Sequence, residues 1–158
     1  MPIDAEMPSQ AEDPYALSKQ VDELTARMMA RRHGMSVVAL RLPYVGGMDE
    51  RLAEFAARCA ADPGVHARGL WSYLETRDAA RACLLALNVP GTGAHVIDVA
   101  APETLVPQPT EELLRRYHPG TEARSPLPGR TVPVDLSLAR SLLGFTAEHL
   151  VDIRPATP

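Results

Sequence analysis

The chain contains 158 residues, a length that fits one ordinary domain with a hydrophobic core of its own. Its 16 basic and 20 acidic residues include no run of basic charge that would follow a phosphate backbone, so we expect no nucleic-acid partner. The hydrophobic fraction of 46% and the charged fraction of 23% are typical of a globular protein and exclude general disorder.

The chain begins with thirteen residues that include Pro2, Pro8 and four acidic side chains, and this composition predicts an extended polar arm. The arm has neither the basic start nor the apolar run of a signal peptide. Nowhere does the sequence approach the roughly 18 to 20 consecutive apolar residues of a membrane span. We therefore expect a soluble, cytoplasmic protein without a membrane partner.

A helix is predicted to follow the arm, because Asp13 can cap its first turn and Pro14 fits the first helical position. The helix is predicted to end at His33, since Gly34 is a suitable C-terminal stop. Four apolar side chains recur at helical spacing and predict one stripe along it: Leu17, Val21, Leu24 and Met28.

Two apolar runs, 36–42 and 95–99, predict strands that are buried on both faces of a parallel sheet. Shorter strands are predicted at 70–74 and 132–134. Helices and strands that alternate in this way favour an α/β fold. Two buried strands are few for this amount of helix, so we expect part of a larger sheet to be missing. The further helices are predicted from caps, stops and apolar spacing at four segments: 49–61, 76–87, 110–117 and 135–144.

Each of the two cysteines falls within an apolar helical pattern. Neither has the paired spacing of a zinc site or a redox motif, and the five histidines are scattered, so we predict no metal site. Both cysteines are predicted to be buried thiols in a reducing compartment. The predicted helix faces group Cys59 with Leu52, Phe55 and Ala56, and Cys83 with Ala80, Leu84 and Leu87.

Tyr15 and Lys19 lie four residues apart at the start of the first predicted helix, so they share one helix face. A tyrosine phenol titrates near pH ~10 and is a poor base at neutral pH. A neighbouring ammonium and the positive helix N-terminus both lower the pKa of the phenol. The pair therefore predicts a proton-transfer device for a hydroxyl group, and Lys19 is the sole lysine of the chain. The alternative is a surface tyrosine beside a solvated lysine.

Four segments in order, 12–19, 36–47, 76–82 and 135–145, read EDPYALSK, SVVALRLPYVGG, TRDAARA and DLSLARSLLGF. Together they resemble the extended short-chain dehydrogenase/reductase superfamily, in its NAD-dependent epimerase/dehydratase branch. The resemblance implies a partial Rossmann-like, doubly wound parallel sheet over 14–100. It also implies a small C-terminal substrate-side α/β part over 101–158, so that 1–158 is a single truncated domain.

The resemblance also implies site residues. Tyr15 would be the catalytic acid/base, and Lys19 would bond the nicotinamide ribose of NAD or NADP. Pro43 and Val45 match the loop that passes the nicotinamide. Tyr44 stands where many members that act on nucleotide sugars have a substrate-binding asparagine, which weakens the expectation of such a substrate. The arginines that match substrate-lining segments, and that are otherwise solvated surface residues, are Arg77, Arg124 and Arg130.

The sequence departs from this family in two ways. It has no Gly-rich turn of the G-x-x-G-x-x-G type, which holds the cofactor pyrophosphate, and no serine or threonine matches the family's third catalytic residue. We therefore expect weak or no dinucleotide binding by this chain alone. The leading hypothesis is half of an NAD(P)-dependent epimerase, dehydratase or reductase acting on a small, sugar-like substrate. The alternative is a non-catalytic module that assembles with a second copy or a complementing chain, pairing through the first helix or the sheet edge.

Overall fold

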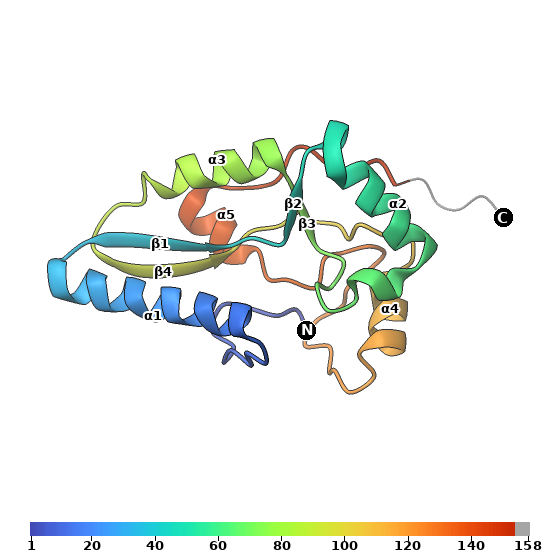
Figure 1. The fold of residues 1–158 in the computed structure, drawn as a ribbon, viewed down its shortest axis with the longest axis horizontal. Coiled ribbons are helices and arrows are strands. Elements are labelled where there is room, and N and C mark those ends of the chain that lie inside the picture. Colours follow the sequence, from blue (N-terminus) through green and yellow to red (C-terminus); the bar gives the residue numbers. More distant parts are fainter. Residues whose placement is uncertain (154–158) are drawn as a thin grey trace.

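The structure, a computed structural model, describes residues 1–153, so residues 154–158 of the predicted 101–158 part lie outside it. Two short parallel sheets join the helices (Figure 1). In chain order the elements are α1 (Pro14–His33), β1 (Ser36–Arg41), β2 (Tyr44–Gly46), a π-helical turn (Met48–Leu52), α2 (Ala53–Ala61), a 3₁₀ turn (Pro63–His66), β3 (Tyr73–Glu75), α3 (Thr76–Ala86), β4 (Gly93–Asp98), α4 (Thr110–Tyr117) and α5 (Ser137–Leu143).

Strands β1 and β4 run parallel, with the register Ser36 to Gly93 at one end and Arg41 to Asp98 at the other. Strands β2 and β3 form the second parallel pair. Figure 1 shows α1 and α3 on opposite sides of the β1–β4 pair, and α5 contacts β4. The predicted α/β fold with parallel strands joined by helices is therefore confirmed.

Helix α1 begins and ends as predicted. The side chain of Asp13 accepts a hydrogen bond of 2.8 Å from the Ala16 amide, and Gly34 takes the left-handed conformation with φ 64°. Ala30 is the one buried residue of this 20-residue helix. The stripe of Leu17, Val21, Leu24 and Met28 instead faces solvent, with exposed fractions from 40% to 59%.

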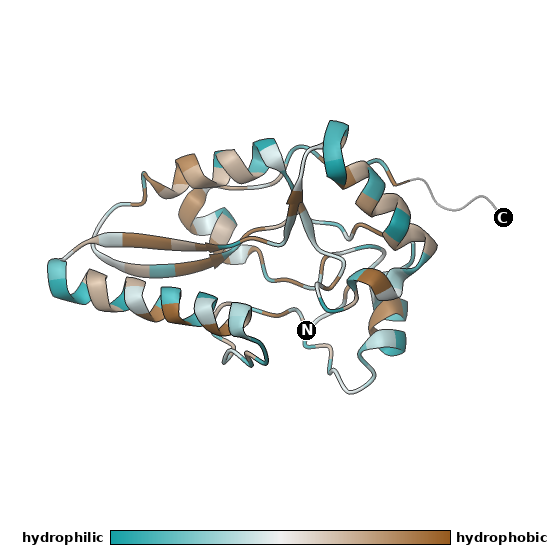
Figure 2. Ribbon diagram, viewed as in Figure 1, coloured by the Kyte–Doolittle hydropathy of each residue, from teal (hydrophilic) through white to brown (hydrophobic). Residues whose placement is uncertain are grey.

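The hydrophobic core lies away from this exposed stripe of α1. Most brown, hydrophobic ribbon in Figure 2 belongs to the strands, to α3 to α5, and to the segments that join them. Asp78 is fully buried there, and its carboxylate accepts hydrogen bonds from the amides of Glu148 and His149. The largest fully buried apolar side chains are Trp71, Tyr73, Phe145, Leu52, Leu74, Ile97 and Leu105.

Strand β1 is only half-buried, which corrects the prediction that it is covered on both faces. Among residues 1–153 it pairs with β4 alone, so its other edge has no neighbouring strand. Val96, Ile97 and Asp98 at the end of β4 are buried as predicted, because α5 and the core pack against them.

The predicted inner face of α3 is wrong. Ala80, Cys83, Leu84 and Leu87 are exposed, and Leu87 keeps 83% of its side chain accessible. The helix packs inward through small side chains, Ala79 and Ala82, together with the buried Asp78. Alanine allows α3 to approach β3 and α5 closely, while Leu84 and Leu87 face solvent and Leu85 packs partly against the core. Burial of Cys59 is confirmed and burial of Cys83 is contradicted.

Two predicted strands differ in extent. The segment 70–74 begins as a turn, because Leu70 and Trp71 both have a left-handed φ of 53°, and the strand starts only at Tyr73. Residues 132–134 form a single parallel bridge between Val134 and Ile3 rather than a strand. The N-terminal arm is therefore attached to the body of the molecule at Ile3.

Candidate active site

The first turn of α1 presents Tyr15 and Lys19 on one face. The cap at Asp13 fixes where the helix begins, and Tyr15 lies two residues later. The Lys19 ammonium nitrogen lies 5.8 Å from the centre of the Tyr15 ring. The phenol is 74% exposed, so a ligand can reach its hydroxyl. The two residues predicted to act together are thus neighbours in the structure.

Lys19 is also held by an acidic side chain on the next turn. Its Nζ lies 2.6 Å from Oδ2 of Asp22. This hydrogen bond, and after it the negative charge of Asp22, raise the pKa of Lys19 above its ordinary value. The ammonium therefore stays protonated at neutral pH and keeps its positive charge beside Tyr15.

A groove of about 450 Å³ lies between this face of α1 and the end of β1. Tyr15, Lys19, Asp22 and Glu23 form one wall, and residues 39–42 form the other. The groove thus lies at the carboxyl end of a parallel strand, where open α/β sheets bind their ligands.

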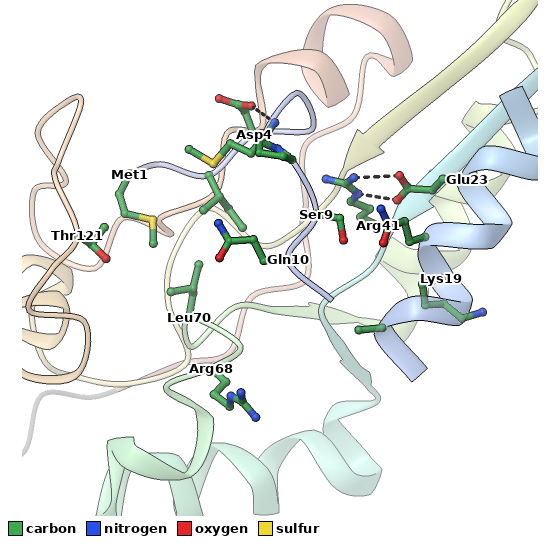
Figure 3. A pocket seen from close by; sticks show the side chains of 15 residues that line it. Met1, Asp4, Ser9, Gln10, Lys19, Glu23, Arg41, Arg68, Leu70 and Thr121 are labelled. Carbon is green, nitrogen blue, oxygen red and sulfur yellow. Dashed lines mark hydrogen bonds and ion pairs between the residues drawn. The ribbon is translucent and has the colours of Figure 1, made fainter. Parts of the chain in front are cut away.

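Arg41 and Glu23 connect the two walls of this groove (Figure 3). The Arg41 guanidinium donates two hydrogen bonds to the Glu23 carboxylate, of 2.7 Å and 3.0 Å. Bidentate pairs of this kind are strong and directional. The hydrogen bond from Arg41 lowers the pKa of Glu23, so the pair is ionised at neutral pH. It fixes the last residue of β1 to the helix that carries Tyr15 and Lys19.

A larger cavity of about 780 Å³ opens on the other side of Lys19 (Figure 3). It lies between the N-terminal arm, α1 and the loop before β3. Its lining includes the Arg41–Glu23 pair, the arm residue Asp4 and the loop residue Arg68. Four neutral polar side chains also line it: Ser9, Gln10, Gln20 and Thr121. Lys19 borders both this cavity and the groove, and the lining suits a polar ligand that forms many hydrogen bonds.

A smaller cavity of about 200 Å³ adjoins the larger one at the ends of β1 and β4. Pro43 lines it, together with Asp98, Ser72 and Leu42. Burial raises the pKa of the Asp98 carboxyl to about 6, against the opposing charge of Arg41. Pro43 is thus the residue of the predicted nicotinamide loop that borders a cavity.

The other predicted residues occupy packed positions or ion pairs. The Tyr44 ring stacks on Phe55 with 3.9 Å between the ring centres, and Val45 packs against the core. Arg77 pairs with Glu75, Arg124 with Asp4, and Arg130 with Glu103. Arg124 reaches the large cavity indirectly, since Asp4 lines it, and none of the three arginines lines the three cavities described above.

Sequence reasoning missed Glu23, Arg41 and Asp98. The helical spacing could have indicated Glu23, because this residue lies one helical turn beyond Lys19 on the same face. Arg41 and Asp98 each end an apolar strand, and the carboxyl ends of parallel strands meet at one edge. Their pairing depends on the strand register, which no local pattern in the sequence reports.

The described part of the chain, 1–153, contains no cluster of His, Cys, Asp or Glu suited to a metal ion. Its histidines have structural contacts: His66 Nε2 lies 3.0 Å from the Ser72 carbonyl, and His118 Nε2 lies 2.9 Å from the Ala67 carbonyl. No helix in the same residues is long and apolar enough to cross a membrane.

Comparisons of sequence give no match, either to protein-family models or to curated proteins. Solved structures do match. MoeE5 in complex with UDP-glucose and NAD is similar over 94% of this chain, with 24% identity and a TM-score of 0.60. UDP-N-acetylglucosamine 4-epimerase from Bacillus cereus is similar over 95%, with 17% identity and a TM-score of 0.61. RMD from Pseudomonas aeruginosa, complexed with NADPH, is similar over 94%, with 21% identity and a TM-score of 0.60.

The chain spans 52% to 55% of the length of these three proteins. At such identities the similarity establishes the fold alone. Of these neighbours, MoeE5 is described in complex with UDP-glucose and NAD, and RMD in complex with NADPH. The predicted resemblance to epimerases and dehydratases with a Rossmann-like fold is therefore confirmed at the level of the fold.

Proposed function

We propose that this chain is the part of an NAD(P)-dependent epimerase, dehydratase or reductase that carries the catalytic pair and the substrate-side wall. The observation that carries the proposal is the position of Tyr15 and Lys19. The two side chains share an exposed helix face beside the carboxyl end of β1, at a groove of about 450 Å³. The fold shared with MoeE5 and the Bacillus epimerase supports this assignment.

The residues present fit one end of a dinucleotide. Lys19 carries a stable positive charge and an exposed ammonium, which suit it to donate hydrogen bonds to ribose hydroxyls. Pro43 borders the adjoining cavity, where main-chain contacts to a nicotinamide fit. The sequence has no Gly-rich turn for the pyrophosphate, so the remaining part of the fold, on this or a second polypeptide, would hold that end. When bound, NAD(P) would accept or return a hydride.

Tyr15 would transfer the proton of the substrate hydroxyl. The Lys19 ammonium nitrogen lies 5.8 Å from the centre of the Tyr15 ring, close enough to assist proton transfer at the phenol. Asp22 keeps the ammonium in place until a ligand competes for it. These contacts support the role of general acid or base that we propose for Tyr15.

The proposed substrate is small and sugar-like. The large cavity offers amide and hydroxyl side chains, which pair well with ring hydroxyls. MoeE5, with the same fold, is described in complex with UDP-glucose. Arg124 would contribute by holding Asp4 at the cavity, whereas Arg77 and Arg130 would support the surrounding loops through their carboxylate partners. The unpaired thiols of Cys59 and Cys83 are in keeping with a cytoplasmic location.

Titration of the ¹⁵N-labelled chain with UDP-glucose and with NAD tests this proposal. We expect amide shifts at Tyr15, Lys19 and 39–42 with either ligand, and affinity for NAD weaker than micromolar because the pyrophosphate end has no site. Shifts confined to α4, which lies apart from the groove, would contradict the proposed site. Micromolar NAD binding by this chain would contradict the role assigned to the rest of the fold.

A second candidate function is a non-catalytic assembly module, and it rests on the open edge of β1. In residues 1–153 this edge has no partner strand, and unpaired edges invite pairing with another chain. The exposed stripe of α1 offers a second surface, suited to a homodimer. Light scattering after size exclusion tests this candidate: a dimer that Leu24→Glu dissociates supports pairing through α1, and a clean monomer that binds no other chain contradicts assembly. Leu150→Glu is the matched control, since Leu150 is exposed elsewhere.

A further inference from the structure

Asp98 is a buried carboxyl group that borders a cavity. It ends β4 directly opposite Arg41 of β1 and is only 9% exposed. It lines the cavity of about 200 Å³ together with Pro43, Ser72 and Arg68. This cavity shares Ile3, Arg41, Arg68 and Leu70 with the larger one. Asp98 therefore lies within reach of a ligand that occupies both.

The Asp98 carboxylate has no hydrogen-bond donor or ion-pair partner among residues 1–153. Arg41 is the nearest candidate by register, but its Nε and one of its two Nη groups donate to Glu23, and it forms no hydrogen bond or ion pair with Asp98. A carboxylate that borders a cavity and bonds no protein donor is free to accept hydrogen bonds from a ligand in that cavity.

The charges around Asp98 indicate which kind of ligand group could bond its carboxylate. Each basic side chain near the two cavities already has its own carboxylate: Lys19 has Asp22, Arg41 has Glu23, Arg68 has Glu12, and Arg124 has Asp4. Asp98 forms no ion pair among residues 1–153, and Arg41 acts on it through its charge without pairing with it. The pKa of Asp98 is raised to about 6, first by burial and then by Glu23, Asp4 and Asp135, with Arg41 opposing. The group is thus mostly ionised at pH 7.5 and accepts hydrogen bonds.

The cavity walls suit a neutral, hydroxyl-bearing ligand. The large cavity presents Ser9, Gln10, Gln20 and Thr121, which donate and accept hydrogen bonds without charge. Leu70, which lines both cavities, is held in a left-handed turn whose next residue, Trp71, bonds the Pro63 carbonyl at 2.7 Å. The wall beside Asp98 is therefore anchored to the core.

We propose that Asp98 determines substrate specificity by accepting hydrogen bonds from the hydroxyl groups of a neutral sugar ring and by repelling a ring that bears a carboxylate. This inference rests on the proposed function, and it adds a residue and a charge preference to the site. The like-charge repulsion acts because the group is largely desolvated and the nearest cation, Arg41, is held by Glu23.

The test compares UDP-glucose with UDP-glucuronic acid on the full chain at pH 7.5, by ¹⁵N-amide titration. We expect UDP-glucuronic acid to bind about tenfold more weakly than UDP-glucose. Asp98→Asn, which keeps the shape and removes the charge, should weaken UDP-glucose binding several-fold and bring the two affinities to within about threefold. Asp49→Asn is the matched control, because Asp49 is an exposed carboxylate in the turn before α2.

The outcomes separate this inference from the proposed function. Equal binding of both sugars by the unaltered chain, or an unchanged preference in Asp98→Asn, overturns the role of Asp98 while leaving the proposed function standing. No binding of either sugar overturns both. A second measurement needs no variant: lowering the pH from 7.5 to 5 should narrow the preference, since Asp98 becomes protonated, whereas a preference that stays constant contradicts the inference.

Discussion

Helix α1 and the region that packs around Trp71 differ sharply in how they are held. In α1, a helix of 20 residues, only Ala30 is buried, and four apolar side chains face solvent. Around Trp71 the chain buries large side chains completely and satisfies their polar atoms, as when the Tyr73 hydroxyl accepts a hydrogen bond of 2.9 Å from the Val151 amide. The proposed catalytic pair lies in the first region and most of the core lies in the second.

This difference indicates that stability and chemistry are largely separate in the molecule. Substitutions in the core should unfold it, and substitutions on the exposed face of α1 should change ligand contacts alone. Asp98 lies at the boundary, because it is buried like a core residue and lacks partners like a site residue. Four measurements test whether stability and chemistry are separate in this way.

The largest effect is expected for Trp71→Ala. The side chain is fully buried, bonds the Pro63 carbonyl and contacts the rings of Tyr117 and His118. Its loss should lower the free energy of unfolding by about 3–5 kcal/mol, measured by urea denaturation. Leu24→Ala on α1 is the control and should cost less than about 1 kcal/mol. Similar losses for both variants would remove the distinction between the two regions.

Tyr15→Phe should remove activity without changing stability. In an enzyme completed by the rest of the fold, we expect the turnover rate to fall by about 10²–10⁴, because the proton-transfer group is lost. The denaturation midpoint should stay unchanged, since the side chain is 74% exposed. Leu17→Ala, a neighbouring exposed position, should keep full turnover. Full turnover of Tyr15→Phe would contradict its role as the acid or base.

Asp98→Asn should stabilise the protein at neutral pH. The folded pKa of about 6 lies above the ordinary value of 3.8, so the folded state binds the proton more tightly than the unfolded state does. The resulting stability is present below pH ~4 and is lost as the pH rises to about 6. At pH 7.5 the variant should therefore gain about 3 kcal/mol over the parent, and at pH 3.5 the gain should vanish. Urea denaturation at both pH values checks this, and a gain independent of pH would show that the charge is not its cause.

The smallest effect concerns Asp22→Asn. The Asp22 carboxylate raises the pKa of Lys19 through a hydrogen bond, so its removal should lower that pKa towards the ordinary value. NMR titration of the Lys19 side chain measures the change. The denaturation midpoint should stay the same, because the pair is exposed. An unchanged Lys19 pKa would mean that the two side chains do not pair in solution.

The sequence predicted what depends on near neighbours. The ends of α1 follow from Asp13 and Gly34, and the Tyr15–Lys19 face follows from a spacing of four. It failed where burial depends on distant parts of the chain. The apolar pattern of α3 predicted the wrong inner face, because small alanines, and not leucines, face β3 and α5.

The same reason explains the parts of the site that were missed. Arg41 and Asp98 are 57 positions apart and meet only through the parallel register of β1 and β4. The pairing of arginines with carboxylates, such as Arg124 with Asp4, likewise joins the arm to a distant loop. Two of the three arginines predicted to bind an anion, Arg124 and Arg130, thus pair with carboxylates that only the fold brings near.

The composition of the chain gives Lys19 one more property. It is the single lysine among 158 residues, and more than half of its side chain is accessible. The other amine in the described residues, the terminal amino group of Met1, donates a hydrogen bond of 2.6 Å to the Glu122 carbonyl. Reductive methylation with ¹³C-formaldehyde would therefore place one side-chain reporter in the molecule, on the helix that carries the proposed catalytic pair. Spectroscopy of that single dimethylamine would follow events at Tyr15 without any engineered label.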